Sequence, residues 1–598
     1  MSRYVALAWP APSEDGKAQA ARLSSQLQDA SRWTLALDRP GLEIWTAKSA
    51  RLPVCELGRS GCVVVGDIFD RQPLSLTGRA VTAGPPHAVA KQLISTRWGA
   101  YVALLEDPAD MSRWVLREPG GFLEAHTWTV GEVAVVAEEL QALPIALRPA
   151  HSRLDWAVIT ELARYQSNAT HLAPLSGIAP IVPGELRRAG DVETSPKLAW
   201  SPRNWIGNDE PAAAADLRSC VFGAVSSLAN PEPSLVVEVS GGLDSAIVTA
   251  ALIETGHRPR IVEALNYYGA RRAGDERPWA AGFCNSYNLP LTMVAQEVGE
   301  LTLEDLAEFS TSMGPAFGAV DVFYDRDVAG RIRDLGASAL LGGKGGDAVF
   351  FQMPTAAVVA DAFRHDWRTE GGRTLQNTAR WLRRSVWSVG LEAVGRRATA
   401  ASDPERAAMF WGPRAWETAP ARRHPWLTDL AGVPPAKRIQ IQALVGTQAH
   451  WSRSRRGQAT RVVHPLLAQP VLEFCLATPA WQLVQGGRDR AFAREAFACL
   501  LPPAVAQRRS KGALDALFNQ RAAASLEMLR PHLLDGLLVG AGVLDSVALD
   551  AAMTPDKLML KADGAQLIRL ALLESWVRHW QTRAPDADGV RGRSGSGS

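Results

Sequence analysis

The chain has few cysteines, and neither its cysteines nor its histidines fall at a spacing that holds a metal. Its 598 residues contain no Cys-x-x-Cys pair, and its 11 histidines contain no His-x-x-x-His pair. The six cysteines are scattered: Cys55, Cys62, Cys220, Cys284, Cys475 and Cys499. This scatter argues against a structural zinc site and against a disulfide framework, and it favours the reducing environment of the cytoplasm.

The sequence also lacks a long apolar run and an excess of charge of one sign. No run reaches the length of a membrane span, and the start of the chain has no signal-peptide core. The net charge is only +2, with 47% hydrophobic and 21% charged residues, as in ordinary globular proteins. We therefore expect a cytoplasmic protein without a membrane span and without a nucleic-acid partner.

A chain of 598 residues is too long for one core, so more than one domain is expected. Residues 1–205 carry short β-rich runs separated by turn residues, which predicts a sheet-dominated domain. These runs are Cys62–Val65, Tyr101–Leu105, Trp114–Leu116 and Val133–Val136. The irregular segment 195–211 marks a boundary to a second domain, 206–590, and residues 591–598 have the composition of a flexible tail.

Strand and helix patterns alternate in the second domain. The predicted strands are Ser234–Val239, Arg260–Leu265 and Ala337–Leu341, and the helices are Ser245–Thr255, Asp275–Tyr287 and Asp325–Leu335. This alternation predicts an α/β fold with a doubly wound parallel sheet, in which ligands bind at the carboxyl ends of the strands. From residue 356 onward the pattern is mainly helical, with a closing helix over Asp563–Trp580.

A glycine turn follows the first of these strands, with the sequence Ser240-Gly241-Gly242-Leu243-Asp244-Ser245. A strand, a glycine turn and a helix start together direct backbone N–H groups at one point, which makes an anion site. The Gly-Lys-Ser/Thr of the Walker-type loop is absent, so the turn predicts phosphate binding of another kind.

A second glycine turn, Gly342-Gly343-Lys344-Gly345-Gly346-Asp347, follows the third predicted strand. If both strands lie in one parallel sheet, Asp244 and Asp347 face one crevice, and two carboxylates there suit a magnesium ion. Leu265, at the end of the second predicted strand, is either a neighbour of the nucleotide or a plain core residue.

These two turns resemble the ATP-site motifs of the ATP pyrophosphatases, and specifically of asparagine synthetases and their relatives. Three further segments follow in that family's order: Gly274–Ala280, His464–Leu467 and Arg508–Gly512. The resemblance implies an asparagine-synthetase-like, amide-forming domain that uses ATP and Mg²⁺ and adenylates its substrate. It implies nucleotide contacts from Ser240–Ser245, Leu265, Gly342 and Gly343, metal ligation by Asp244 and Asp347, and charge stabilisation by Lys511 during acyl transfer.

The first 205 residues resemble the family's glutaminase domain, a sandwich of the N-terminal-nucleophile type, through Arg117–Gly120 and Gly177–Gly184. A working glutaminase needs an N-terminal Cys and an asparagine oxyanion donor, but this chain has Ser2 and Val65 at those places. Losing an oxyanion donor alone costs about 10²–10³ in rate. We therefore expect a degenerate domain that supplies no ammonia from glutamine.

Lys344 is a second departure, because asparagine synthetases carry Glu and β-lactam synthetases carry Tyr near that position. Three roles are open for Lys344: contact with a phosphate, action as a base with a lowered pKa, or a plain solvated position in the loop. With the non-Cys start and the tryptophan-rich helical half, the chain looks most like a lasso peptide cyclase. This implies a precursor peptide as substrate, and a leader-binding protein and a leader protease as partners.

Other interpretations remain open at this stage. The alternatives are an ammonia-dependent asparagine synthetase, a β-lactam synthetase, and a non-catalytic peptide-binding assembly protein built on a dead synthetase.

Residues 361–400 hold eight Arg against four acidic residues, interleaved with Trp367, Trp381 and Trp387. Three interpretations of this segment are open. We expect a solvated helical face whose tryptophans lie in the core, and the alternatives are a nucleic-acid surface and a peptide-binding face.

Overall fold

The structure is a computed structural model. It describes residues 3–58, 61–71, 81–141, 143–150, 152–165, 170–207, 211–269, 275–366, 368–396, 410–417, 422–508, 515–560 and 563–581.

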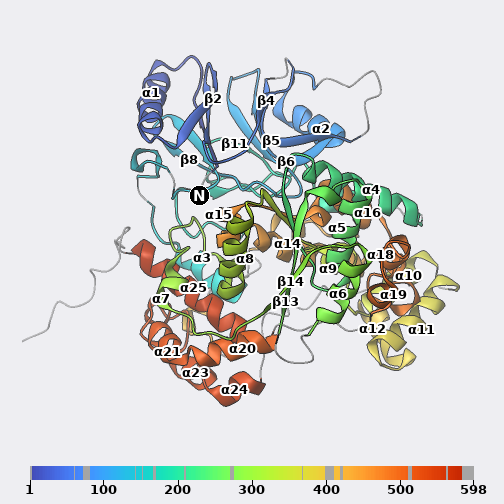
Figure 1. Cartoon of the computed structure of the whole chain (residues 1–598). Helices are drawn as coiled ribbons and strands as arrows, with labels where there is room; N and C mark the ends of the chain where they lie inside the picture. The colour runs from blue at the N-terminus through green and yellow to red at the C-terminus, as the bar shows by residue number, and fades with distance from the viewer. Residues whose placement is uncertain are drawn as a thin grey trace, which may run out of the picture.

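Two antiparallel sheets form the N-terminal part of the described chain (Figure 1). One contains, in spatial order, β10 (Ala179–Pro180), β8 (His126–Val130), β9 (Val133–Ala137), β1 (Tyr4–Ala8), β3 (Leu42–Ala47) and β2 (Trp33–Arg39). The other contains β11 (Leu186–Arg188), β7 (Arg113–Arg117), β6 (Arg97–Glu106), β5 (Cys62–Asp70) and β4 (Val54–Glu56). All four predicted β-runs of this region lie within these strands.

Alternate side chains of the two sheets meet in a shared core, which makes this part a sandwich. Tyr4 and Ala6 from one sheet pack with Val63 and Val65 from the other. The opposite faces are covered by helices, among them α1 (Glu14–Asp29) and α3 (Trp156–Arg164) on the first sheet and α2 (Pro86–Thr96) on the second. The sheet-dominated fold predicted for the region is thus present.

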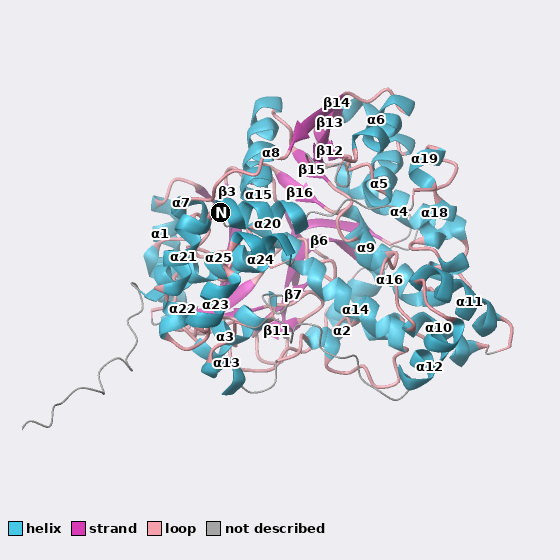
Figure 2. Ribbon diagram, turned by 90° about the horizontal axis from the view of Figure 1, so that it is seen from below, coloured by secondary structure: helices cyan, strands magenta, loops and turns pink. Residues whose placement is uncertain are grey.

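A parallel sheet lies next to the sandwich. Within the described residues its spatial order is β14 (Leu291–Ala295), β13 (Ile261–Tyr268), β12 (Leu235–Glu238), β15 (Ala339–Leu341) and β16 (Arg461–Val463). Figure 2 shows α8 (Val322–Leu335) and α15 (Arg455–Ala459) on one side of it, and α5 (Leu243–Glu254) and α6 (Arg277–Ser286) on the other. Helices on both faces are the doubly wound arrangement that the alternation predicts.

The side-chain alternation of β12 explains why both faces are covered. Val236 points into a cluster with Val328 and Ile332 of α8, whereas Val237 packs with Ile247 of α5. A strand that is apolar on both faces needs a cover on each, as parallel strands usually have.

The remaining described elements are mainly helical. The helices between residues 214 and 447 that have not yet been named are α4 (Ala214–Ala229), α7 (Leu303–Ala307), α9 (Gly346–Val349), α10 (Ala357–His365), α11 (Glu370–Leu382), α12 (Val386–Arg396), α13 (Pro413–Glu417) and α14 (Pro435–Thr447). Later come α16 (Gln469–Ala477), α17 (Ala480–Leu483), α18 (Ala491–Ala496), α19 (Pro503–Ala506), α20 (Asp515–Ala524), α21 (Leu526–Leu534), α22 (Leu537–Gly540), α23 (Ser546–Ala552), α24 (Pro555–Leu560) and α25 (Gly564–Gln581). In the described chain, no helix has the length and apolar character needed to cross a membrane.

The helical half differs from expectation at one tryptophan. Trp387 on α12 is 81% exposed, so the expectation that the tryptophans of residues 361–400 lie in the core is wrong for this residue. Trp381 is half-buried, and Trp367 lies outside the described residues.

Arg117 secures the loop that joins the two sheets of the sandwich. Its guanidinium donates to three backbone carbonyls, those of Leu123 at 2.7 Å, Gly121 at 2.9 Å and Ile181 at 2.9 Å. The neighbouring Glu118 carboxylate accepts from the backbone N–H groups that follow it, and burial raises its pKa to about 8. The Arg117–Gly120 segment is therefore a structural clamp.

Replacing Arg117 by leucine should destabilise the fold strongly, because three buried carbonyls lose their donor. We expect a loss of roughly 3 kcal/mol in the free energy of unfolding, measured by urea denaturation. The matched control is Arg188→Leu, which removes an exposed ion pair with Asp110 and should cost less than about 1 kcal/mol. Equal stability of the two variants would contradict the clamp.

Candidate active site

The first glycine turn lies between β12 and α5, at the carboxyl end of the parallel sheet. Gly241 adopts a φ of +78°, and a Cβ at this residue would lie 2.7 Å from the carbonyl oxygen of Glu276. Only glycine combines this backbone conformation with this close approach. Gly242 is the N-cap of α5, and among the described residues no side chain caps this helix start.

Two serines close the turn on itself. The Ser240 N–H donates to Ser245 Oγ at 3.2 Å, the two hydroxyl oxygens lie 3.1 Å apart, and the Gly242 N–H donates to Ser240 Oγ. The turn is therefore rigid before any ligand binds, with the start of α5 open to an anion.

The second glycine turn packs directly against the first. A Cβ at Gly343 would lie 2.4 Å from Ser245 N, and one at Gly346 would lie 2.4 Å from Asp244 Cγ. Any side chain at these positions would push the two strand ends apart. The glycines thus bring Asp244 and Asp347 into the same crevice, as the parallel-sheet argument predicts.

Arg490 joins the two carboxylates. Its Nη1 lies 2.7 Å from Asp244 Oδ2 and 2.8 Å from Asp347 Oδ1. The residue is 6% exposed, has a left-handed φ of +50°, and donates its N–H to the carbonyl of Phe351. The sequence analysis missed Arg490, because no local motif marks a residue so far along the chain from both turns.

The two carboxylates also suit a divalent cation. They converge on a single positively charged atom, and their oxygens are the ligands that Mg²⁺ prefers. The Asp347 side chain is 45% exposed, so it remains open to water and phosphate oxygens, which usually complete a magnesium shell. No group of three or more His, Cys, Asp or Glu side chains gathers as a metal site in the described part of the chain.

Lys344 lies on the second turn, three residues before Asp347. It is half-buried, and its Nζ lies 5.7 Å from the ring centroid of Tyr324 on α8. Burial and the nearby Arg456 lower the pKa of Lys344 to about 8, against the opposing effect of acidic neighbours such as Glu238. A lysine with this pKa is partly neutral near physiological pH and can accept a proton.

Two histidines that the sequence analysis did not single out as site residues, His450 and His464, lie near enough to this lysine to feel its charge. The His464 ring is 1% exposed, and neither ring nitrogen has a hydrogen-bond partner among the described residues. His450 lies 6.0 Å from it, centroid to centroid. Burial and Lys344 hold the pKa of both rings below its ordinary value, so both are neutral at pH 7.

Two further residues predicted to lie in the site are Leu265 and Lys511. The side chain of Leu265 is 1% exposed and packs under α8, while its carbonyl accepts from the Val239 N–H; β13 continues to Tyr268. Its side chain is therefore a core leucine. Lys511 lies outside the described residues, but Arg508, at the start of the same segment, donates to the Gly241 carbonyl and pairs with Glu276.

Replacing Gly343 by alanine tests whether the close approach of the two turns matters. The new Cβ collides with Ser245 N, so we expect ATP affinity to fall at least tenfold, together with a modest loss of stability as the strand ends separate. Calorimetric titration with ATP measures this. Gly330→Ala on α8, where a Cβ meets nothing, is the control and should bind ATP like the parent; unchanged affinity of Gly343→Ala would refute the interlock.

Comparisons with known proteins agree with this geometry. A family model described as asparagine synthase matches residues 217–578. No curated protein matches the chain. A solved structure, the allosteric regulatory enzyme of purine biosynthesis, is 11% identical over 50% of this chain and 82% of its own, with a TM-score of 0.19, which supports no argument. The chain belongs to the asparagine synthase family and is an ATP-dependent, AMP-forming carbon–nitrogen ligase.

Proposed function

We propose that the enzyme is a lasso peptide cyclase. It adenylates an Asp or Glu side-chain carboxylate of a precursor peptide and closes a macrolactam with the peptide's N-terminal amine. The observation that carries this proposal is Lys344, a half-buried amine with a lowered pKa beside the paired glycine turns. It stands where asparagine synthetases have a carboxylate, and it suits an amine nucleophile that must lose a proton.

The first step is activation of the carboxylate. A carboxylate oxygen of the peptide attacks the α-phosphorus of ATP, whose phosphates lie on Ser240–Ser245, and pyrophosphate leaves. Asp244 and Asp347 would hold a magnesium ion, which supplies positive charge to the phosphates. Arg490, between the same carboxylates, keeps them in place and adds a fixed cation to the crevice.

The second step is acyl transfer. The peptide's amine attacks the acyl carbon, loses a proton to the neutral Lys344 Nζ, and AMP leaves. Because both reacting groups belong to one bound peptide, the step is intramolecular, which is worth on the order of 7–11 kcal/mol when the geometry is good. We retain the prediction that Lys511 stabilises the negative charge of this step.

The N-terminal domain, residues 1–205 in this proposal, is a degenerate glutaminase domain with a structural role. Val65 is fully buried between the sheets and offers no donor. Asp67 forms an ion pair with Arg461 of β16 at 2.7 Å, so its carboxylate supports the synthetase sheet. Ser2 lies outside the described residues.

The proposal extends to partners and location. We propose a cytoplasmic enzyme that receives its peptide from a leader-binding protein and a leader protease, and that binds no nucleic acid. A short reading frame and a small protease frame next to this gene would support these partners, and the short frame would supply the candidate peptide.

Ring closure is tested directly by mass spectrometry. With ATP and Mg²⁺, the candidate linear peptide should lose the mass of one water. Asp244→Ala should abolish the product, whereas the exposed control Asp334→Ala should retain it. Release of pyrophosphate with free aspartate but not with any linear peptide would overturn the cyclase proposal in favour of an asparagine synthetase.

The role of Lys344 is tested by separating the two steps. Lys344→Gln should leave ATP–pyrophosphate exchange within about threefold of the parent, but slow ring closure by roughly 10²–10⁴, the usual worth of a general base. In the parent, ring closure should speed up as pH rises through about 8, because the amine must be neutral to accept a proton. The exposed Lys17→Gln is the control; an equal loss of exchange and closure would assign Lys344 to phosphate contact instead.

A further inference from the structure

A second cavity lies between the N-terminal sandwich and the synthetase part of the chain. It opens where β8 begins and β9 ends, and its other walls come from residues 170–180, 312–318 and 448–453. Its cavity volume is about 70 Å³. A water molecule needs about 10–15 Å³ of such space, so the cavity has room for a small polar group such as a carboxylate.

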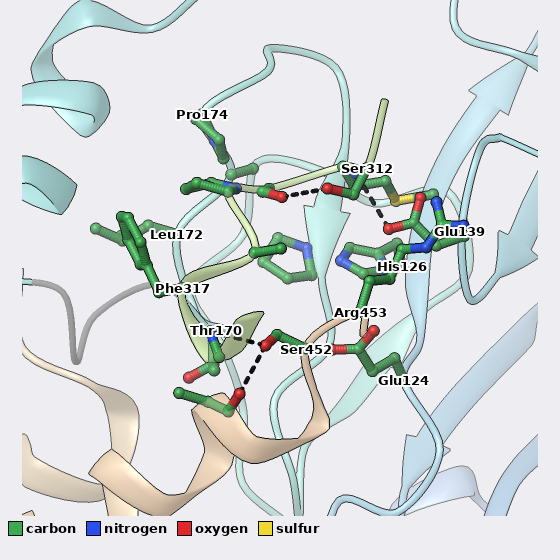
Figure 3. A pocket seen from close by; sticks show the side chains of 18 of the residues that line it. Glu124, His126, Glu139, Thr170, Leu172, Pro174, Ser312, Phe317, Ser452 and Arg453 are labelled. Carbon is green, nitrogen blue, oxygen red and sulfur yellow. Dashed lines mark hydrogen bonds between the residues drawn. The ribbon is translucent and has the colours of Figure 1, made fainter. Parts of the chain in front are cut away.

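The cavity has a polar side and an apolar side (Figure 3). The polar side is made by Glu124, His126, Glu139 and Arg453, and the apolar side includes Leu172 and Phe317. Mostly apolar walls with a few convergent polar groups are the usual make-up of a ligand site.

Arg453 is the group that points to a ligand. Its Nε and Nη1 are buried, and neither has a hydrogen-bond partner among the described residues. A hydrogen bond left unmade by a buried donor destabilises the free protein, and more so for a charged group. Arg117, also in the cavity wall, differs because its guanidinium is occupied by three carbonyls.

The Arg453 guanidinium interacts electrostatically with the Glu139 carboxyl and opposes the rise of its pKa, but neither Nε nor Nη1 makes a hydrogen bond to it in the described chain. Glu139 accepts from the backbone N–H groups of Met313 and Leu140, and burial raises its pKa to about 7. Burial also raises the pKa of Glu124 to about 8, so this group is mostly neutral at pH 7. Burial lowers the pKa of His126 to about 4, which makes it neutral as well. Arg117 and Arg453 are the basic side chains of the wall, and of the two only Arg453 has nitrogens without a hydrogen-bond partner in the described chain.

One short segment separates this cavity from the proposed reaction site. Ala449 and Arg453 line the cavity, whereas His450 and Arg456 lie close enough to Lys344 to shift its pKa or have theirs shifted by it. Residues 448–456 are therefore a shared wall, with Lys344 on one side and the Arg453 guanidinium on the other.

We propose that this cavity binds the C-terminal carboxylate of the peptide substrate, paired with Arg453, while the preceding apolar side chain packs against Leu172 and Phe317. This inference rests on the proposed ring closure. That reaction uses the N-terminal amine and one side-chain carboxylate, so the C-terminal α-carboxylate is the charge that every linear substrate still carries. Holding it across the wall fixes the tail while the ends react.

Binding is tested without ATP and without the natural peptide. The probe is N-acetyl-L-phenylalanine, compared with its carboxamide, in ligand-observed NMR titrations of the full chain. The acid should bind at least tenfold more tightly than the amide. Arg453→Gln should remove this preference, Arg453→Lys should keep part of it, and the exposed Arg22→Gln should leave it unchanged. Equal binding of acid and amide, or a preference that survives Arg453→Gln, would overturn the site.

Turnover separates failure of this site from failure of the proposed function. With a peptide that cyclises, C-terminal amidation should raise KM about tenfold and leave kcat unchanged in the parent, and it should have no effect in Arg453→Gln. If the peptide cyclises but amidation leaves KM unchanged, the site proposal fails and the cyclase stands. If the acid probe binds through Arg453 but no linear peptide reacts, the carboxylate site stands and the cyclase fails.

Discussion

The close packing of two glycine turns is the constraint on which the site depends. Gly343 and Gly346 allow the ends of β12 and β15 to approach so closely that Asp244 and Asp347 reach one nitrogen of Arg490. In our proposal, this cluster of one cation and two carboxylates at the carboxyl end of a parallel sheet is where the magnesium nucleotide binds. The position of Lys344 follows from the same packing, because it lies on the second turn between the two glycines.

The N-terminal sandwich supports this arrangement from outside. Asp67 pairs with Arg461 of β16, and the indole of Trp451 donates to the Gly120 carbonyl at 3.1 Å. The second contact anchors the segment that separates Lys344 from the Arg453 cavity. We propose that the N-terminal region is a degenerate glutaminase domain whose role is to hold this segment in place.

The sequence predicted the elements whose signals are local. Apolar runs that end in glycine turns marked β12 and β15, and the rule that parallel strands share a carboxyl edge placed Asp244 beside Asp347. It did not single out Arg490, His450 or His464 as site residues, because their positions are decided by packing between distant segments. It left the role of Leu265 open, since only the pairing of β13 with β14 up to Tyr268 shows how far that strand extends.

The claim that a peptide carboxylate is adenylated is tested most directly by isotope transfer. A linear peptide whose reactive side-chain carboxylate carries a heavy-oxygen label is converted in a single turnover, and the AMP is analysed by mass spectrometry. The account predicts one labelled oxygen in AMP and none in pyrophosphate, because the carboxylate oxygen attacks the α-phosphorus and stays on it when the amine displaces AMP. Unlabelled AMP in a reaction that forms the ring would contradict it.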